Sequence, residues 1–253
     1  MSRPLLWHFP VSHFNEKARW ALDWKRIPHD REVLGPSYVL RAPLSTGQMS
    51  LPILFLEGRA VADSTRIIEA LERYQPDPPL YPADPEERRR ALEIEDFFDE
   101  ELGHALRSAL IGRAFASDPH FGVEILATGM SAGGRAFMHA AGPLFRFVYQ
   151  RRHAIDEESS REGYEKIDAA LDRVEKERAG RDYLVGDAFS VADLTAAALL
   201  SPLCQPPEYP ASFPDDPPDW FADYLLGLSK HPAMAWVLET YRRHRGRWEG
   251  DAS

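Results

Sequence analysis

Two short stretches near the start of the chain place hydroxyl and carboxyl side chains where helices are expected to begin. Ser12 precedes an amphipathic segment in which Phe14 and Ala18 recur on one face, and Asp63-Ser64 precedes a second such segment. Free backbone N–H groups and the helix dipole at these positions stabilise an anionic sulfur or a carboxylate. The same side chains can also act as plain helix caps. The pattern therefore indicates either a binding site for a small polar ligand or two capped helices.

Hydrophobic spacing predicts the elements that would hold these residues, in the order β-α-β-(α)-β-β-α. Strands are expected at residues 5–9, 29–34, 52–56 and 59–61, the last two forming a hairpin across Glu57-Gly58. The first helix ends at Ile27-Pro28 and the last ends before Pro76, because proline restricts the residue before it. The pattern does not decide the helix content of residues 35–47.

A proline-rich stretch separates this part of the chain from the rest. Five prolines between Gln75 and Pro85 predict a stiff linker and a domain boundary. Beyond it, helices are predicted at residues 86–115, up to 152 with a break at the glycines of 129–134, around 164–174, and at 190–200 and 233–243. Ser190 and Asp193 have the spacing of a capping box. We therefore predict two domains, residues 1–78 and residues 86–250.

Composition limits the classes of function. The 253 residues are 44% hydrophobic and 28% charged, which is typical of globular domains. A net charge of −10, with arginines interleaved among acidic residues, argues against a nucleic-acid partner. Cys204 is the only cysteine, so an internal disulfide and a cysteine zinc site are excluded. We expect a cytoplasmic protein with no metal, no signal peptide and no membrane partner.

The stretch from Ser12 to Arg19 resembles a motif of the glutathione transferase superfamily, and the resemblance extends over nearly the whole chain. Ser12-His13-Phe14-Asn15 is similar to the Ser-Pro-Phe-Cys of serine-type, bacterial-like members. The resemblance implies that the Ser12 hydroxyl points at the sulfur of glutathione. His13 stands where proline is usual and Asn15 where cysteine is frequent. The Asn15 replacement removes cysteine-based thioltransferase chemistry from this position.

The resemblance also implies a set of ligand contacts. Leu51-Pro52 is similar to the residue-plus-cis-proline step of thioredoxin-like folds, in which the backbone of Leu51 pairs with the cysteinyl part of glutathione. Asp63 and Ser64 are similar to the pair that receives the α-ammonium and α-carboxylate groups. Gln48 is a candidate for the glycine end, and His13 is a further candidate contact. An ordinary strand-edge proline remains the alternative at Pro52.

His8 is the alternative catalytic residue. Aligning Phe9-Pro10-Val11 with the corresponding residues of tyrosine-type members places His8 where their catalytic tyrosine lies. An imidazole there could orient or deprotonate a thiol, or it could be a packed, hydrogen-bonded side chain. Ser12 in turn could be a helix cap alone.

The fold class implied is an α/β thioredoxin-like N-terminal domain followed by an all-α C-terminal domain. The function implied is transfer of glutathione thiolate to a small hydrophobic electrophile, or reduction of a peroxide, as in detoxification. Glutathione would be a co-substrate, no cofactor is expected, and the family's usual homodimer is expected. The alternatives are a non-catalytic binding or interaction protein that keeps the fold, and a transferase that uses another thiol.

Overall fold

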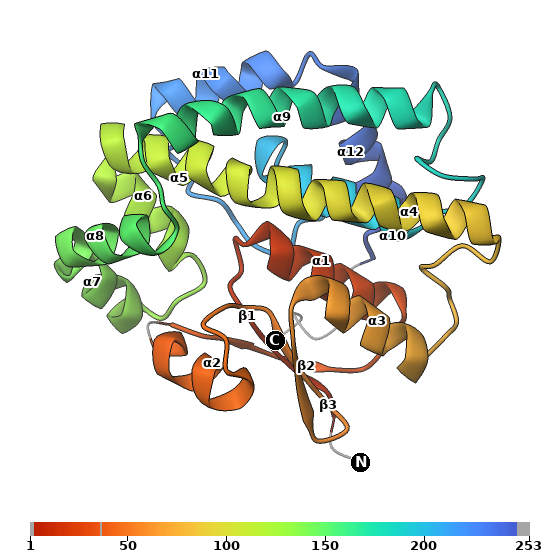
Figure 1. Ribbon diagram of the computed structural model, residues 1–253. Coiled ribbons are helices and arrows are strands. Elements are labelled where there is room, and N and C mark those ends of the chain that lie inside the picture. Colours follow the sequence, from red (N-terminus) through yellow and green to blue (C-terminus); the bar gives the residue numbers. More distant parts are fainter. Residues whose placement is uncertain (1–2, 36, 247–253) are drawn as a thin grey trace.

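The first third of the chain forms a four-stranded mixed sheet with helices on both faces (Figure 1). In the computed structural model, which describes residues 3–35 and 37–246, the strands are β1 (Leu5–His8), β2 (Asp30–Val33), β3 (Ile53–Leu56) and β4 (Arg59–Ala62). Their order in the sheet is β2-β1-β3-β4. β1 runs parallel to β2, and β3 runs antiparallel to both of its neighbours.

Side-chain alternation along the strands assigns a helix layer to each face of the sheet. Leu6 and Leu54 join the main core beneath α1 (His13–Trp24) and α3 (Ser64–Tyr74). Trp7 and Ile53 point the other way and pack in a separate cluster with Ala42 of α2 (Tyr38–Thr46). The predicted order β-α-β-(α)-β-β-α is confirmed, with α2 as the helix whose presence the sequence did not decide.

The described chain from Pro85 to Gly246 contains helices and loops and no strand. Its helices are α4 (Pro85–Phe97), a π-helical turn (Phe98–Gly103), α5 (His104–Ser117), α6 (Pro119–Ala127), α7 (Ala132–Ala140), α8 (Gly142–Arg152), α9 (Glu157–Arg178), α10 (Val191–Leu200), a short 3-10 turn (Ser201–Leu203), α11 (Asp219–Leu228) and α12 (Pro232–His244). A thioredoxin-like domain followed by an all-helical one is the predicted fold class, and it is confirmed. No helix in these residues is both long and apolar enough to cross a membrane.

The helical part differs from the sequence prediction at two places. The helix expected at residues 86–115 is interrupted by the π-helical turn, although α4 and α5 continue in one line across the molecule (Figure 1). The helix α11 was not predicted. Phe221 is buried while Leu226 is 65% exposed, so apolar residues of α11 extend beyond its buried face and obscure its helical period.

The core is built around α10, in which every residue is buried. This helix packs against α1, α4 and α12, and α1 in turn packs against α3. Asp193 accepts hydrogen bonds from the N–H of Ser190 (2.9 Å) and of Leu184 (2.8 Å), and the predicted capping box at the start of this helix is present. The linker predicted at residues 75–85 falls between α3 and α4. The predicted domain limits, residues 1–78 and 86–250, stay a prediction. Within these two ranges, residues 1, 2, 36 and 247–250 lie outside the described residues.

Candidate functional site

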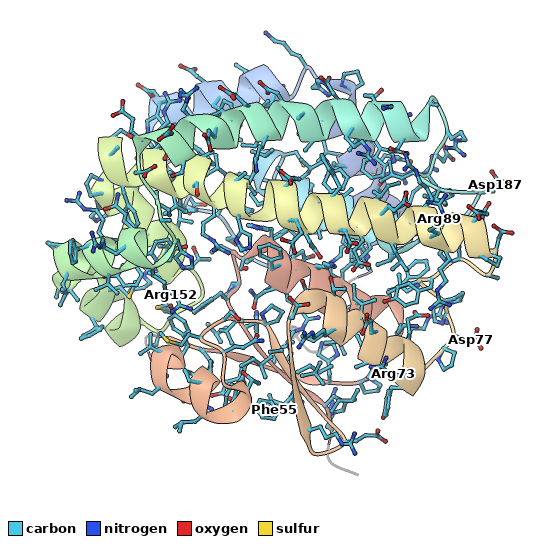
Figure 2. All side chains as sticks on the ribbon, in the orientation of Figure 1. Phe55, Arg73, Asp77, Arg89, Arg152 and Asp187 are labelled. Atoms are coloured by element: carbon cyan, nitrogen blue, oxygen red, sulfur yellow. The ribbon has the colours of Figure 1, made fainter. Side chains whose placement is uncertain are left out.

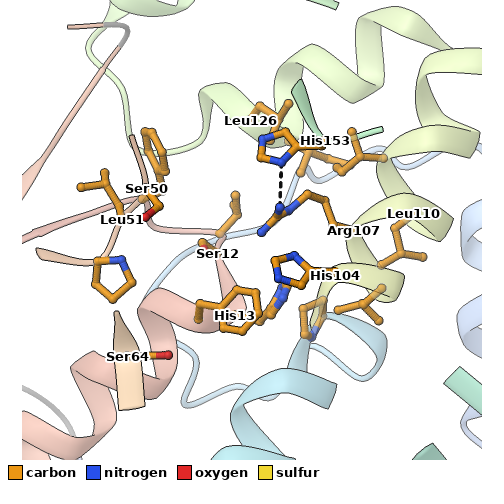
Figure 3. A pocket seen from close by; sticks show the side chains of 18 of the residues that line it. Ser12, His13, Ser50, Leu51, Ser64, His104, Arg107, Leu110, Leu126 and His153 are labelled. Atoms are coloured by element: carbon orange, nitrogen blue, oxygen red, sulfur yellow. Dashed lines mark hydrogen bonds between the residues drawn. The ribbon is translucent and has the colours of Figure 1, made fainter. Parts of the chain in front are cut away.

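A cavity of about 730 Å³ lies between the N-terminal domain and the helices α5 to α8. One wall is formed by the start of α1, the segment 48–52 and the start of α3, and the other by helical-domain side chains (Figure 3). All the ligand contacts expected from the sequence line this cavity: Ser12, His13, Gln48, Leu51, Pro52, Asp63 and Ser64. The fold therefore brings together residues that are up to 52 positions apart in the sequence.

The Ser12 hydroxyl is oriented by Asn15. The Nδ2 group of Asn15 donates to Ser12 Oγ at 2.7 Å and to the carbonyl of Leu51 at 3.3 Å, while its Oδ1 accepts from the N–H of Phe9 at 3.1 Å. A backbone N–H can only donate and a carbonyl can only accept, so these partners determine which way the amide faces. Because Ser12 Oγ already accepts from Asn15, the hydroxyl proton is left to be donated to a ligand.

Asn15 was not predicted as a site residue, although it is buried beneath the cavity wall. The signal in the sequence that could have identified Asn15 is its amide side chain, three positions after Ser12, the residue that precedes the helix. The Ser12 side chain accepts no hydrogen bond from the backbone N–H groups at the start of α1. The alternative in which Ser12 is only a helix cap therefore does not match its hydrogen bonds.

His13 and Phe14 dock the start of α1 on the π-helical turn. His13 Nε2 donates to the carbonyl of Gly103 at 2.9 Å, and burial together with the charge of Arg107 lowers the pKa of His13 to about 3. The imidazole is therefore neutral near pH 7. The ring of Phe14 packs so closely on Gly103 that a Cβ at that position would lie 2.2 Å from its Cζ atom.

Leu51-Pro52 is a cis peptide, as the sequence resemblance implied. It precedes β3 and brings the backbone of Leu51 to the cavity. Gln48 also lines the cavity, and its side chain is exposed. Its backbone N–H donates to Thr46 Oγ1.

Asp63 and Ser64 form the cavity wall at the start of α3. Asp63 has φ 78° and ψ 131°, a conformation that residues with a side chain rarely adopt. Its Oδ1 accepts from the N–H groups of Thr65 (3.0 Å) and Arg66 (3.2 Å), so the residue does cap the helix. The side chain is exposed, and its second carboxylate oxygen is available to a ligand. Ser64 follows as the first residue of the helix and is 4% exposed.

A buried ionic cluster, which was not predicted from the sequence, joins the elements that form this wall. Lys17 Nζ lies 2.7 Å from Glu95, 2.5 Å from Asp99 and 2.8 Å from Thr65 Oγ1, joining α1 to α3, α4 and the π-helical turn. Burial opposes the charged form, but the two carboxylates outweigh it and raise the pKa of Lys17. The cluster holds the beginnings of α1 and α3 in a fixed relation.

His8, the alternative catalytic residue, does not line the cavity. It is buried, and its Nδ1 accepts a hydrogen bond from Arg19 at 2.9 Å. Burial and the charge of Arg19 lower the pKa of His8 to about 2. A neutral imidazole whose acceptor nitrogen is occupied matches the packed, hydrogen-bonded reading of this residue.

The helical-domain wall combines an apolar surface with several polar side chains. The apolar side chains are Leu106, Leu110, Ile111, Phe121, Ile125, Leu126, Met130, Met138 and Phe145. Arg107 NH1 donates to His153 Nδ1 at 2.9 Å, with His104 nearby (Figure 3). Arg152 reaches from the end of α8 to Met49, at the edge of the cavity (Figure 2). No motif predicts this wall, because its residues come from separate helices and from the loops between them.

One group in the described residues could hold a metal ion. Ligand atoms of His120, Glu124 and His139 lie within 4.8 Å of one another on α6 and α7. None of the three lines the cavity, so this group is not part of the candidate site.

Comparisons with known proteins agree with the fold. The model of the glutathione S-transferase N-terminal domain matches residues 6–79, and that of the C-terminal domain matches residues 137–219. FtsZ-localized protein A of Caulobacter vibrioides is 24% identical over 201 residues, covering 78% of this chain and 75% of that protein.

Two solved structures extend the likeness to the whole chain. The β-etherase LigF from Sphingobium sp. strain SYK-6 has a TM-score of 0.68 and 22% identity, covering 97% of this chain and 96% of that chain. A glutathione S-transferase from Methylobacterium radiotolerans, in complex with glutathione sulfonate, has a TM-score of 0.60 and 23% identity, covering 98% and 97%. At these identities the two structures establish a shared fold.

Proposed function

The chain belongs to the glutathione transferase superfamily, and we propose that it binds glutathione and activates its thiol for attack on a small electrophile or a peroxide. Glutathione is a co-substrate in this proposal, and the reaction requires no resident cofactor.

The observation that carries the proposal is the orientation of the Ser12 hydroxyl. Ser12 Oγ accepts from Asn15, so its proton is donated into the cavity at the start of α1. A free thiol has a pKa of about 8.5, so only a few per cent is thiolate at neutral pH. A hydrogen bond from Ser12, together with the dipole of α1, stabilises the thiolate and lowers that pKa. The nucleophile is then present at neutral pH.

The other cavity residues hold the rest of glutathione. The second carboxylate oxygen of Asp63 pairs with the α-ammonium group, and Ser64 receives the α-carboxylate through its hydroxyl and its own backbone N–H. The cis peptide presents the backbone of Leu51 to the cysteinyl part, and His13 and Gln48 complete the contacts. The apolar wall then receives the electrophile.

The proposal is tested by a thermal shift with glutathione and by conjugation of chlorodinitrobenzene. We expect millimolar glutathione to raise the Tm and conjugation to exceed the uncatalysed rate. The matched variant is Asp63→Asn, which keeps an oxygen for the cap of α3 but removes the charge. Its glutathione affinity should fall about tenfold with little loss of stability, since a hydrogen bond to a charged group contributes about 1.5–3 kcal/mol. Absence of any thermal shift would contradict the proposal.

A second candidate function is a non-catalytic interaction protein. The similarity to FtsZ-localized protein A supports it, as do exposed apolar side chains on α7 and α8, among them Phe137, Leu144 and Phe147. Binding of glutathione without turnover of chlorodinitrobenzene or a peroxide would favour this candidate over the transferase.

A further inference from the structure

Three arginines line the cavity, Arg66, Arg107 and Arg152, and of these only Arg107 is half-buried while the other two are exposed. Arg107 lies on α5, and within residues 3–35 and 37–246 no carboxylate oxygen lies within 4.0 Å of its guanidinium. The buried cations nearby are all paired: Lys17 with Glu95 and Asp99, and Arg19 with Glu16. A guanidinium carries five N–H donors, and a single one of those of Arg107 is used, toward His153.

The carboxylates of Asp99 and Glu100 line the same cavity and act on His104, but neither forms an ion pair with Arg107. Burial and the charge of Arg107 lower the pKa of His153 and of His13 to about 3, and the same causes lower the pKa of His104. All three imidazoles are therefore neutral near pH 7. The ring of Phe14 lies under the guanidinium at 6.0 Å, which adds a weak attraction but no negative charge.

The position of Arg107 lies between the thiol site and the apolar part of the cavity. Figure 3 shows its side chain between His153 and His104, across from Ser12, with Leu110 and Leu126 farther along the wall. A charge in such surroundings is stabilised when a ligand brings an opposite charge. The planar fork of a guanidinium matches a carboxylate in two parallel hydrogen bonds.

We propose that Arg107 binds a carboxylate on the electrophilic substrate, so that the preferred substrates are apolar or aromatic electrophiles that carry a carboxylate. The inference rests on the proposed function, because it assigns the second substrate of the same cavity. The carboxylate pairs with Arg107, the apolar body lies against Leu110 and Leu126, and the reactive carbon faces the sulfur held by Ser12.

The test compares para-chloro-meta-nitrobenzoate with the corresponding benzamide, which has the same shape and no charge. In each reaction the thiolate forms a bond to the ring carbon that carries chlorine, and chloride leaves with the bonding electron pair. Arg107→Gln should lower kcat/KM for the benzoate about 10- to 100-fold and change it for the benzamide less than about threefold. Arg113→Gln, an exposed arginine on the same helix outside the cavity, should change neither.

A binding measurement separates this inference from the proposed function. Titration with the unreactive meta-nitrobenzoate and meta-nitrobenzamide, in the presence of S-methylglutathione, should show tighter binding of the benzoate and loss of that preference in Arg107→Gln. If the protein converts neither the chloronitrobenzoate nor the chloronitrobenzamide but still binds meta-nitrobenzoate more tightly than meta-nitrobenzamide, the transferase proposal fails. The carboxylate site at Arg107 is then still supported. The inference is overturned if wild type does not prefer the benzoate. It is also overturned if Arg107→Gln leaves the preference for the benzoate unchanged, whether or not the variant binds glutathione more weakly.

Discussion

The direction of the Ser12 hydroxyl depends on Asn15, a residue that does not touch the ligand position directly. The amide is held by the N–H of Phe9 on one side and by the carbonyl of Leu51 on the other. Its donor then meets Ser12 Oγ. Replacing a cysteine of the family motif with asparagine thus removes one chemistry and supplies an orienting group for another.

This arrangement predicts a large effect of Asn15→Asp. The carboxylate has no donor, so the Ser12 hydroxyl would turn to donate to it, and its charge would repel a thiolate. We expect the conjugation rate at neutral pH to fall at least about 100-fold, with partial recovery at higher pH. The pH–rate profile of the purified variant provides the measurement. A rate close to that of wild type would mean that Asn15 does not orient Ser12.

Sequence patterns located the side of the candidate site that belongs to the N-terminal domain. Ser12, Leu51, Asp63 and Ser64 follow local motifs at the starts of helices and strands, and all line the cavity. Arg107 could not be located in this way, because its significance lies in what surrounds it: three imidazoles, two of them from other elements, and no carboxylate that forms an ion pair with it.

At the scale of elements, the contact between α1 and the π-helical turn connects the thiol site to the long helix pair α4 and α5. His13 bonds to the carbonyl of Gly103, and the ring of Phe14 fills the space that a side chain at Gly103 would need. A helical period continues through residues 86–115, and this is why the sequence did not indicate the turn.

The contact predicts that Gly103→Ala destabilises the protein. The added methyl would lie 2.2 Å from Phe14, so the ring must move, and overpacking of this kind costs about 1–3 kcal/mol. The start of α1 should move with it, lowering the conjugation rate. Gly133→Ala is the control, because nothing lies within 4 Å of its added Cβ atom. Urea unfolding measures both variants, and equal stabilities would show that α1 does not depend on this contact.

Two helices, α2 and α11, show why local sequence patterns predicted the fold incompletely. α2 contains Pro43 in its interior and has one buried residue, so the usual helix signals are weak. α11 follows a proline-rich loop and is apolar on most of its surface. Both helices form because tertiary packing favours them, and that packing is not visible in a short window of sequence.

At the scale of the whole molecule, the buried histidines predict acid sensitivity. His8 and His13 have folded-state pKa values of about 2 and about 3, whereas an unfolded histidine titrates near 6.5. Their stabilising effect is complete above about pH 6.5 and is lost as pH falls, because the unfolded chain then binds protons that the folded protein does not. Each contributes a slope of up to about 1.4 kcal/mol per pH unit. Asp193 acts in the opposite direction, because burial raises its pKa to about 6.

The measurement is the free energy of unfolding in urea between about pH 7.5 and about pH 5, for wild type and His8→Gln. Glutamine cannot be protonated, so the variant should lose stability less steeply below about pH 6.5, and Asp193 contributes equally to both proteins. Parallel curves for the two proteins would show that His8 is not buried in its neutral form.

We also expect the chain to form a homodimer, as the resemblance to the family implied. The mass of one chain is 28.7 kDa, so light scattering at micromolar concentration should give about twice that value. A mass of one chain under these conditions would contradict this expectation and leave the proposals for the cavity unaffected.

The most direct test of the central proposal is an ultraviolet titration of the thiolate of bound glutathione. In the wild-type complex the thiol pKa should lie below its solution value of about 8.5. Ser12→Ala should raise it by about 1–2 units, because a hydrogen bond to a charged group contributes about 1.5–3 kcal/mol, while affinity changes by less than about tenfold. His8→Gln should leave the titration unchanged, since His8 does not line the cavity. A wild-type thiol that titrates at its solution value, or a shift that persists in Ser12→Ala, would contradict activation of glutathione by Ser12.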